Sequence, residues 1–227
     1  MIPAPFGSGV VFVTGAGGFL GGHVAASFTE AGWTVAGFER GESELGDLAQ
    51  AAGELGTPEG IFHAAGSGSG GVSLPDPAGD FDAGLGSLRQ TLEFMRQQAP
   101  AARLIFPSSA AVYGEGQAGP IAETAPVRPV SPYGLHKALA EQLIAGWADL
   151  FGLDAVCVRF FSIYGPGLRK QLLWDIARRI GEGAEDLELS GDGEEARDFL
   201  HVEDAVALIG KLTGLPRGAG PAVVNGG

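Results

Sequence analysis

The sequence predicts an α/β fold in which helices cover both faces of a doubly wound parallel sheet. Short apolar runs alternate with helical patterns along the chain, and a glycine-rich turn joins the first run to the first helix. The chain has 227 residues, which is long enough to enclose one large core. Crossovers between strands are expected to be right-handed. Six segments are expected to be strands: residues 10–14, 34–38, 61–64, 103–107, 154–160 and 222–225.

The first strand is a run of valine and phenylalanine over residues 10–13, as is typical of a buried parallel strand. It ends in a turn that contains Gly15, Gly18 and Gly21, and the helix that follows carries Val24 and Phe28 on one face. Glycines let the backbone approach a pyrophosphate, and the start of the helix supplies N–H donors. The spacing differs from the G-x-G-x-x-G of many dehydrogenases, but the strand–turn–helix context predicts a dinucleotide site.

The second strand ends at Glu39, 18 positions after Gly21. A carboxylate at this place can accept hydrogen bonds from the adenosine ribose and repels a 2′-phosphate, which favours NAD. Arg40 lies next to it and could accommodate that phosphate, so NADP stays open as the alternative.

The fourth apolar run leads into Ser108 and Ser109. Side chains at the carboxyl end of a parallel strand face the crevice where ligands bind. A serine hydroxyl there can form a hydrogen bond with a reacting oxygen. An ordinary exit from a strand into a loop explains the two serines equally well.

Tyr133 and Lys137 carry the chemistry that the sequence predicts. Ser131 is a good N-cap and Pro132 suits the first helical position, so a helix is expected to begin here. Positions i and i+4 share one face of a helix. A nearby ammonium favours the phenolate and brings the tyrosine pKa, ordinarily near ~10, towards neutral pH. The pair could then shuttle a proton for an alcohol/ketone couple, although a surface helix with a solvated lysine has the same spacing.

Charge and composition exclude several classes of partner. The net charge of −13 argues against nucleic acid and anionic membranes as partners. An anionic substrate would need a local positive site, for which the candidates are Arg159, Arg169, Lys170 and Arg197. The single cysteine, Cys157, allows no disulfide within the chain and favours the cytoplasm. No signal peptide is evident, and no apolar run approaches the ~20 residues of a membrane span. The four histidines lack the spacing of metal ligands.

These motifs together resemble the extended short-chain dehydrogenase/reductase family, and within it the NAD-dependent epimerase/dehydratase group that acts on nucleotide sugars. The resemblance runs from Val10 to the end of the chain. It is carried by Thr-Gly-x-x-Gly-Phe-Leu-Gly at 14–21, His-Ala-Ala-Gly at 63–66, Ser-Ser-Ala-Ala-Val-Tyr-Gly at 108–114, Tyr-Gly-x-x-Lys at 133–137, Arg-Phe-Phe-Ser-Ile-Tyr-Gly-Pro-Gly at 159–167 and Arg-Asp-Phe-Leu-His-Val-Glu-Asp at 197–204.

The resemblance implies a role for each site residue. Tyr133 would be the acid/base on the sugar hydroxyl, Lys137 would hold the nicotinamide ribose and lower the tyrosine pKa, and Ser109 would bond the same sugar oxygen. Asp47 and Leu48 match a pair that contacts adenine, although Asp47 is equally suited to be a helix N-cap. Further cofactor contacts are expected from Gly15, Gly18, Phe19, Leu20, Gly21, Ala64 and Ala65, and substrate contacts from Ser108, Ser162, Arg169 and Arg197.

The reaction class follows from two alanines. Ala110 and Ala111 stand where dehydratases and decarboxylases of this family carry acidic residues, so the extra proton-transfer group that those reactions need is missing. What remains is epimerisation through a transient ketone with retained NAD, or reduction of a keto-sugar or other small ketone by NADPH. Ala83, His136 and Ser162 depart from the family pattern and leave open a cofactor-binding protein with a degraded substrate site.

The resemblance also implies the domain organisation. Residues 1–165 would form a Rossmann-like NAD(P)-binding domain. Residues 166–227 would form a reduced substrate-binding part, with about 198–215 returning to the first domain. Two helices carry wide apolar stripes, around Leu85–Met95 and Leu135–Leu150, which packing on the sheet would explain. The resemblance implies a second use for them, as the paired helices of a homodimer. The sugar, its nucleotide and the carbon attacked are not defined by the sequence, nor is the reason for the early C-terminus.

Overall fold

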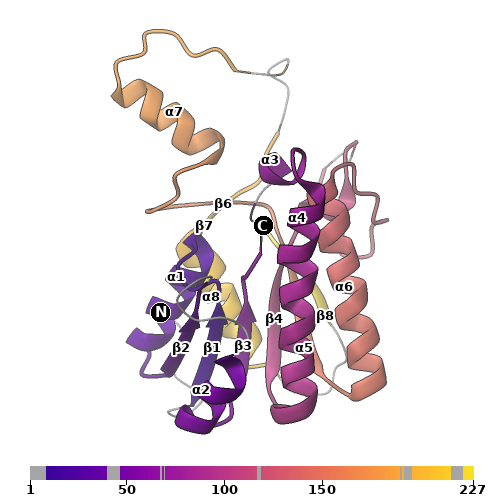
Figure 1. Ribbon diagram of the computed structural model, residues 1–227. Helices are drawn as coiled ribbons and strands as arrows, with labels where there is room; N and C mark the ends of the chain where they lie inside the picture. Colours follow the sequence, from indigo (N-terminus) through magenta and orange to yellow (C-terminus); the bar gives the residue numbers. More distant parts are fainter. Residues whose placement is uncertain are drawn as a thin grey trace.

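The computed structural model describes residues 9–39, 47–66, 68, 70–116, 119–189, 191, 196–215 and 222–227. Its centre is a six-stranded parallel sheet in the order β2-β1-β3-β4-β5-β8 (Figure 1). The strands are β1 (Val10–Thr14), β2 (Thr34–Phe38), β3 (Gly60–His63), β4 (Arg103–Ser109), β5 (Asp154–Phe160) and β8 (Ala222–Gly226). The prediction of a parallel sheet in an α/β fold is confirmed, and all six expected strands are present within two residues of their expected bounds.

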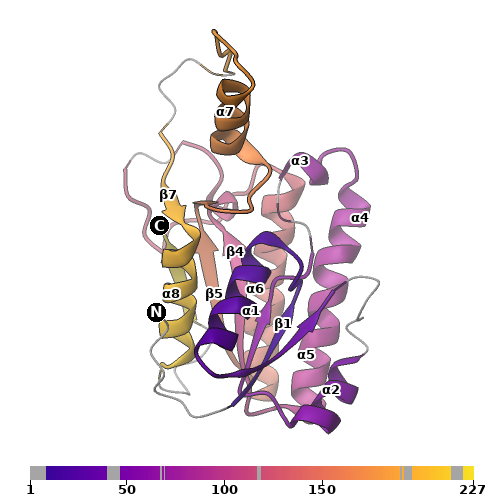
Figure 2. The ribbon, with the colours of Figure 1, turned by 90° about the vertical axis from the view of Figure 1, so that its left-hand side faces the viewer.

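Helices α2 (Leu48–Leu55), α5 (Ser87–Gln98) and α6 (Pro132–Phe151) cover one face of the sheet (Figures 1 and 2). Leu92 and Ile144 from these helices pack with Phe12, Leu104 and Phe106 from the strands. The apolar stripe predicted for α5 is therefore core: Leu88, Leu92 and Met95 are all fully buried.

Helices α1 (Phe19–Glu30) and α8 (Val202–Thr213) cover the opposite face. Val24 and Phe28 of α1 and Ile209 of α8 pack on Val13 and Val158 of the strands. Both helices repeat apolar residues at helical spacing, which is why they bury one face. Helix α8 comes from late in the chain, and β8 after it pairs with β5, so the C-terminal segment returns to the sheet.

The order in which successive strands are added reverses between β1 and β3, and this places the site. Strand β1 pairs with β2 on one side and with β3 on the other, with Thr14 level with both Phe38 and His63. The residues that follow these three strands therefore meet at one carboxyl edge. Ligands of open α/β sheets bind at such a switch point.

Smaller elements gather above this edge. They are α3 (Gly70–Ser73), α4 (Pro77–Phe81), the π-helical turn η2 (Asp82–Gly86), the 3-10 turn η3 (Ala110–Tyr113) and a two-stranded sheet of β6 (Ser162–Tyr164) and β7 (Phe199–His201). Helix α7 (Gln171–Gly181) stands apart from the sheet at the top of Figure 1 and has no buried residue. No helix in the described parts of the chain is both long and apolar enough to cross a membrane.

Candidate active site

The glycine turn has the geometry of a phosphate cradle. Gly15 has a φ of +71°, which favours glycine, and its N–H donates to the carbonyl of Phe38 at 2.8 Å. A Cβ on Gly21 would lie 2.1 Å from the carbonyl oxygen of Gly15, so only glycine fits there. Gly18 is the N-cap of α1 and no side chain caps the helix. The first-turn N–H groups are thus not used by a capping side chain, as an anion site at a helix N-terminus requires.

Two neighbouring strands complete the cradle. The Glu39 carboxylate lies so close to the turn that a Cβ on Gly17 would meet its Oε2 at 2.4 Å. On the other side, the N–H groups of Ala64 and Ala65 donate to the backbone carbonyl and side-chain oxygen of Thr14, at 3.0 and 3.2 Å. Phe19 and Leu20 occupy the first turn of α1 and are partly exposed. Glu39, the glycine turn and the Ala64–Ala65 loop therefore lie side by side. An extended dinucleotide could place its adenosine ribose at Glu39 and its pyrophosphate at the turn.

The sequence-predicted trio of Tyr133, Lys137 and Ser109 meets at the same edge. Helix α6 begins as predicted, with Ser131 as N-cap accepting from the N–H of Gly134 at 3.1 Å and Pro132 in the first turn. Ser109 ends β4 and forms a hydrogen bond with the Tyr133 side chain. Lys137 donates from Nζ to the carbonyl of Pro107 at 2.8 Å and stands 4.6 Å from the centre of the Phe106 ring.

The electrostatics of Tyr133 differ from the prediction. Burial raises its pKa above the ordinary 10, the charge of Asp80 adds to this, and only the hydrogen bond with Ser109 opposes it. Lys137, whose ammonium lies 5.8 Å from the centre of the tyrosine ring, does not lower the pKa of Tyr133 as predicted. Burial also lowers the pKa of Lys137 from 10.5 to about 8.

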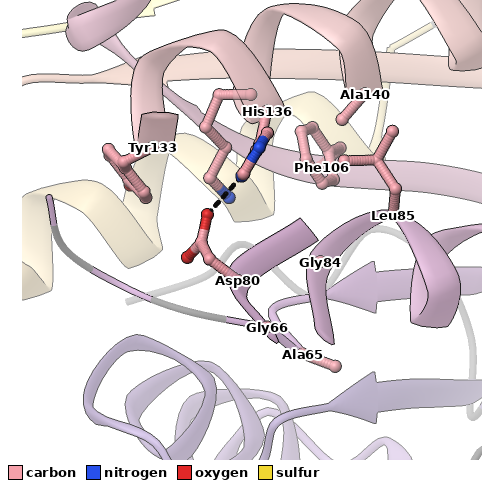
Figure 3. Close-up of a pocket in the computed structure, with 10 residues that line it drawn as sticks. Ala65, Gly66, Asp80, Gly84, Leu85, Phe106, Tyr133, His136 and Ala140 are labelled. Atoms are coloured by element: carbon pink, nitrogen blue, oxygen red, sulfur yellow. Dashed lines mark hydrogen bonds and ion pairs between the residues drawn. The ribbon is translucent and has the colours of Figure 1, made fainter. Parts of the chain in front are cut away.

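A pocket opens beside this trio, and an acid–histidine pair forms part of its wall (Figure 3). Asp80 of α4 points toward His136 of α6, with 2.5 Å between Oδ2 and Nδ1. The Asp80 side chain is only 3% exposed and that of His136 is 13% exposed. The other lining residues are Ala65, Gly66, Gly84, Leu85, Phe106, Tyr133, Lys137 and Ala140.

Sequence analysis missed Asp80. It recognised His136 only as a departure from the family pattern. The signal was present: a histidine three positions after Tyr133 and next to Lys137 faces the interior of the site, where a buried imidazole needs a polar partner. Finding that partner required the position of α4 relative to α6, which the sequence does not give.

Ser108 is a correction to the predicted substrate contacts. Its hydroxyl donates to Glu141 at 2.5 Å and the residue is 4% exposed. It lies two positions after Phe106 and on the same face of β4, so it faces α6. Arg159, considered as a site for an anionic substrate, belongs to the same buried network: it binds Glu141 at 2.6 Å and the Tyr113 hydroxyl at 2.9 Å. Both residues hold β4, β5 and α6 together.

His63 has a structural role. It is fully buried, and its ring lies within hydrogen-bond distance of the hydroxyls of Thr14, Ser87 and Thr91, at 3.0, 3.3 and 3.0 Å. Burial, together with the charge of Lys137, lowers its pKa from 6.5 to about 3. The ring is therefore neutral at physiological pH and cannot serve as a cation for the cofactor.

The remaining predicted residues lie further out. Leu48 is 1% exposed and its side chain packs in the core, so an adenine contact at this position would come from its backbone. Asp47 stands at the N-cap of α2 but accepts no capping hydrogen bond through its side chain. Ser162 begins β6, while Arg169 and Arg197 are exposed near the carboxyl edge. Arg40 lies outside the described residues, so the feature that favours NADP has no structural description.

Comparison with known proteins agrees with this arrangement. The family model described as "NAD dependent epimerase/dehydratase family" matches residues 11–225. The UDP-glucose 4-epimerase of Streptomyces lividans is 32% identical over 229 residues, which cover 87% of this chain and 69% of that protein. The UDP-glucose 4-epimerase of Azospirillum brasilense is 30% identical, covering 96% of this chain and 72% of that protein.

Solved structures show the same relationship. The UDP-glucose 4-epimerase of Thermotoga maritima, solved with UDP-glucose, matches with a TM-score of 0.85 and 26% identity over 96% of this chain and 76% of that one. MoeE5 in complex with UDP-glucose and NAD matches with a TM-score of 0.84 and 30% identity over the same shares. The predicted resemblance is confirmed, and the chain belongs to the NAD-dependent epimerase/dehydratase family.

Proposed function

We propose that this protein is an NAD-dependent epimerase that inverts one carbinol centre of a nucleotide sugar through a transient ketone. The observation that carries the proposal is the meeting of Tyr133, Ser109 and Lys137 beside a glycine turn that fits a dinucleotide. The relatives described above as UDP-glucose 4-epimerases make the 4-position of a UDP-hexose the first substrate to test.

The chain's own residues supply binding and proton transfer. Tyr133 would take the proton of the sugar hydroxyl as the phenolate and return it after inversion, while Ser109 bonds the same oxygen and holds it in line with the phenol. Burial raises the pKa of Tyr133 in the protein alone, so this role requires the positive charges of Lys137 and of the nicotinamide ring to favour the phenolate. Lys137 would hold the nicotinamide ribose. NAD held by the glycine turn would supply reversible hydride transfer at the carbinol carbon. Arg169 and Arg197 are the proposed contacts to the substrate diphosphate, with Ser162 beside them.

NAD rather than NADP is supported by the position of Glu39 against Gly17, where a carboxylate would repel a 2′-phosphate. The NADPH-dependent ketoreductase depends on Arg40, so it has less support. A degraded binding protein is disfavoured because Tyr133 still bonds Ser109 and Lys137 still stands beside it.

The domain division, assembly and location are also proposals. Residues 1–165 would bind NAD, and 166–227 would contribute the substrate side, with about 198–215 on the cofactor domain. A homodimer is supported by Leu135, Leu150 and Phe151 on α6, which are 47%, 76% and 47% exposed. Light scattering that gives the mass of one chain at micromolar concentration would contradict the dimer. The single, buried cysteine fits a cytoplasmic location.

The test of function is a Tyr133→Phe exchange assayed with UDP-glucose and UDP-galactose. The wild-type protein is expected to interconvert the two sugars without added reduced cofactor. Loss of the phenol proton should lower kcat by at least ~100-fold and leave NAD binding intact. Full activity in the Phe variant would refute the assignment of Tyr133. Turnover of a keto-sugar only with added NADPH would instead support the reductase.

A further inference from the structure

The positively charged side chain of Lys137 lies in surroundings that are largely apolar. The pocket around it includes the apolar side chains of Leu85, Phe106 and Ala140. Within the described part of the chain, its ammonium donates one hydrogen bond, to the neutral carbonyl of Pro107. A charge withdrawn from water is costly unless it is paired, so this ammonium needs a counter-charge.

Asp80 is suited to supply that charge. Its side chain lines the same pocket as Lys137, is 3% exposed and enters from α4 toward the face of α6 that carries Tyr133 and His136 (Figure 3). His136 Nδ1 meets its Oδ2 at 2.5 Å, and the Phe81 ring packs edge-on against the imidazole at 5.4 Å. The carboxylate is therefore fixed in direction by a residue that is itself held by packing.

We propose that Asp80 is the counter-charge that keeps Lys137 protonated at the reaction site, and that His136 is a positioning residue for Asp80. The inference rests on the proposed function, because the ammonium serves there to hold the nicotinamide ribose. It adds two residues to the site that lie outside the Tyr133–Ser109–Lys137 trio. The carboxylate's effect on Lys137 agrees in direction: the charge of Asp80 opposes the lowering of the lysine pKa that burial causes.

Other ionisable groups near Lys137 do not replace Asp80. Glu141 on α6 also opposes the lowering of the Lys137 pKa, but less than Asp80 does, and it is bound to Arg159. His63 on β3 is neutral at physiological pH. On β5, burial raises the pKa of the Cys157 thiol to about 12, so it carries no charge at neutral pH. Tyr133 is likewise protonated, which leaves Asp80 as the carboxylate on the pocket wall.

The test is a direct titration of the lysine in the purified full chain. The chain has three lysines, so protein labelled with ¹³C at lysine Cε gives three signals, with exposed Lys170 and Lys211 as internal references. Three variants are compared with wild type: Asp80→Asn, His136→Gln and the matched control Asp82→Asn, which removes an exposed carboxylate two positions away. No cofactor or sugar is needed, so the result is independent of epimerase activity.

Asp80→Asn is expected to lower the titration midpoint of Lys137 by about one pH unit or more, while Asp82→Asn leaves it unchanged. His136→Gln keeps the Asp80 carboxylate but removes the imidazole that directs it, so it is expected to lower the midpoint by less than Asp80→Asn does; no change in His136→Gln would contradict the positioning role. An unchanged midpoint in Asp80→Asn would overturn the proposal. Equal lowering in Asp80→Asn and His136→Gln would also overturn it, because it would show that disruption of the pocket, rather than the charge, matters.

A second comparison measures stability in place of the lysine titration. Without the ammonium, a counter-charge is no longer needed. Asp80→Asn should therefore lower the free energy of unfolding by less in the Lys137→Met protein than in the wild type. Chemical denaturation of the four proteins measures this. The same cost on both backgrounds would contradict the counter-charge role.

Discussion

Replacing Lys137 with methionine should stabilise the protein while it destroys function. Methionine keeps the length of the side chain and removes the charge. Burial lowers the pKa of Lys137 in the folded protein from 10.5 to about 8, which means that the folded state holds this proton less tightly than the unfolded chain does. Folding therefore carries a penalty at neutral pH, which a functional site can retain because it needs the charge.

The size of the penalty follows from the two pKa values. One pKa unit corresponds to about 1.4 kcal/mol, so the interval between 10.5 and about 8 gives an upper limit of about 3 kcal/mol. The penalty is complete below pH 8, where both states are protonated. It disappears as the pH rises towards 10.5, because the folded state then loses the proton first. In Lys137→Met, loss of the hydrogen bond to Pro107 would reduce the gain in unfolding free energy by about 1 kcal/mol.

Urea denaturation at pH 7 and pH 9.5 tests this reasoning. Lys137→Met is expected to raise the free energy of unfolding by about 1–2 kcal/mol at pH 7, with most of that gain absent at pH 9.5. Comparing the two proteins at each pH removes the contributions of other titrating groups. A destabilised variant at pH 7, or a gain that does not change with pH, would refute the claim that this ammonium is held at a cost.

Three further predictions concern the same site. Catalytic activity should fall as the pH rises through about 8, where Lys137 loses its proton, and a profile that is flat to pH 9.5 would contradict this. Gly21→Ala should abolish NAD binding measured by calorimetry, because the new Cβ would meet the Gly15 carbonyl. The control Gly53→Ala places its Cβ in open space on the exposed face of α2, so it should raise the free energy of unfolding by about 0.5–1 kcal/mol. Arg159→Met should lower the free energy of unfolding, measured by chemical denaturation, by about 3–5 kcal/mol, because Glu141 loses its buried partner. Arg169 is exposed, so Arg169→Met should leave the free energy of unfolding unchanged and raise KM.

Local patterns were sufficient to predict the central sheet and the start of the catalytic helix. The alternation of apolar strands and helices predicted the parallel fold, and Ser131 and Pro132 marked the start of α6 correctly because capping depends on neighbouring residues. Strands β6 and β7 have three residues each, too few for a periodic pattern, so they were not foreseen.

Side-chain direction was harder to predict than position. Ser108 and Ser109 look alike in the sequence, but one bonds Glu141 and the other bonds Tyr133. The pairing of Asp80 with His136 spans 56 positions and depends on how α4 rests on α6. Tertiary packing, which no local pattern records, determined each of these outcomes.

The central claim is that this chain is an epimerase that keeps its NAD through each catalytic cycle. The most direct test is to denature the purified protein and identify the nucleotide that it releases by mass spectrometry. We expect the released nucleotide to be NAD, because the hydride must stay on the enzyme between oxidation and reduction. Release of NADP, or a protein that binds neither NAD nor NADP when they are added, would contradict it.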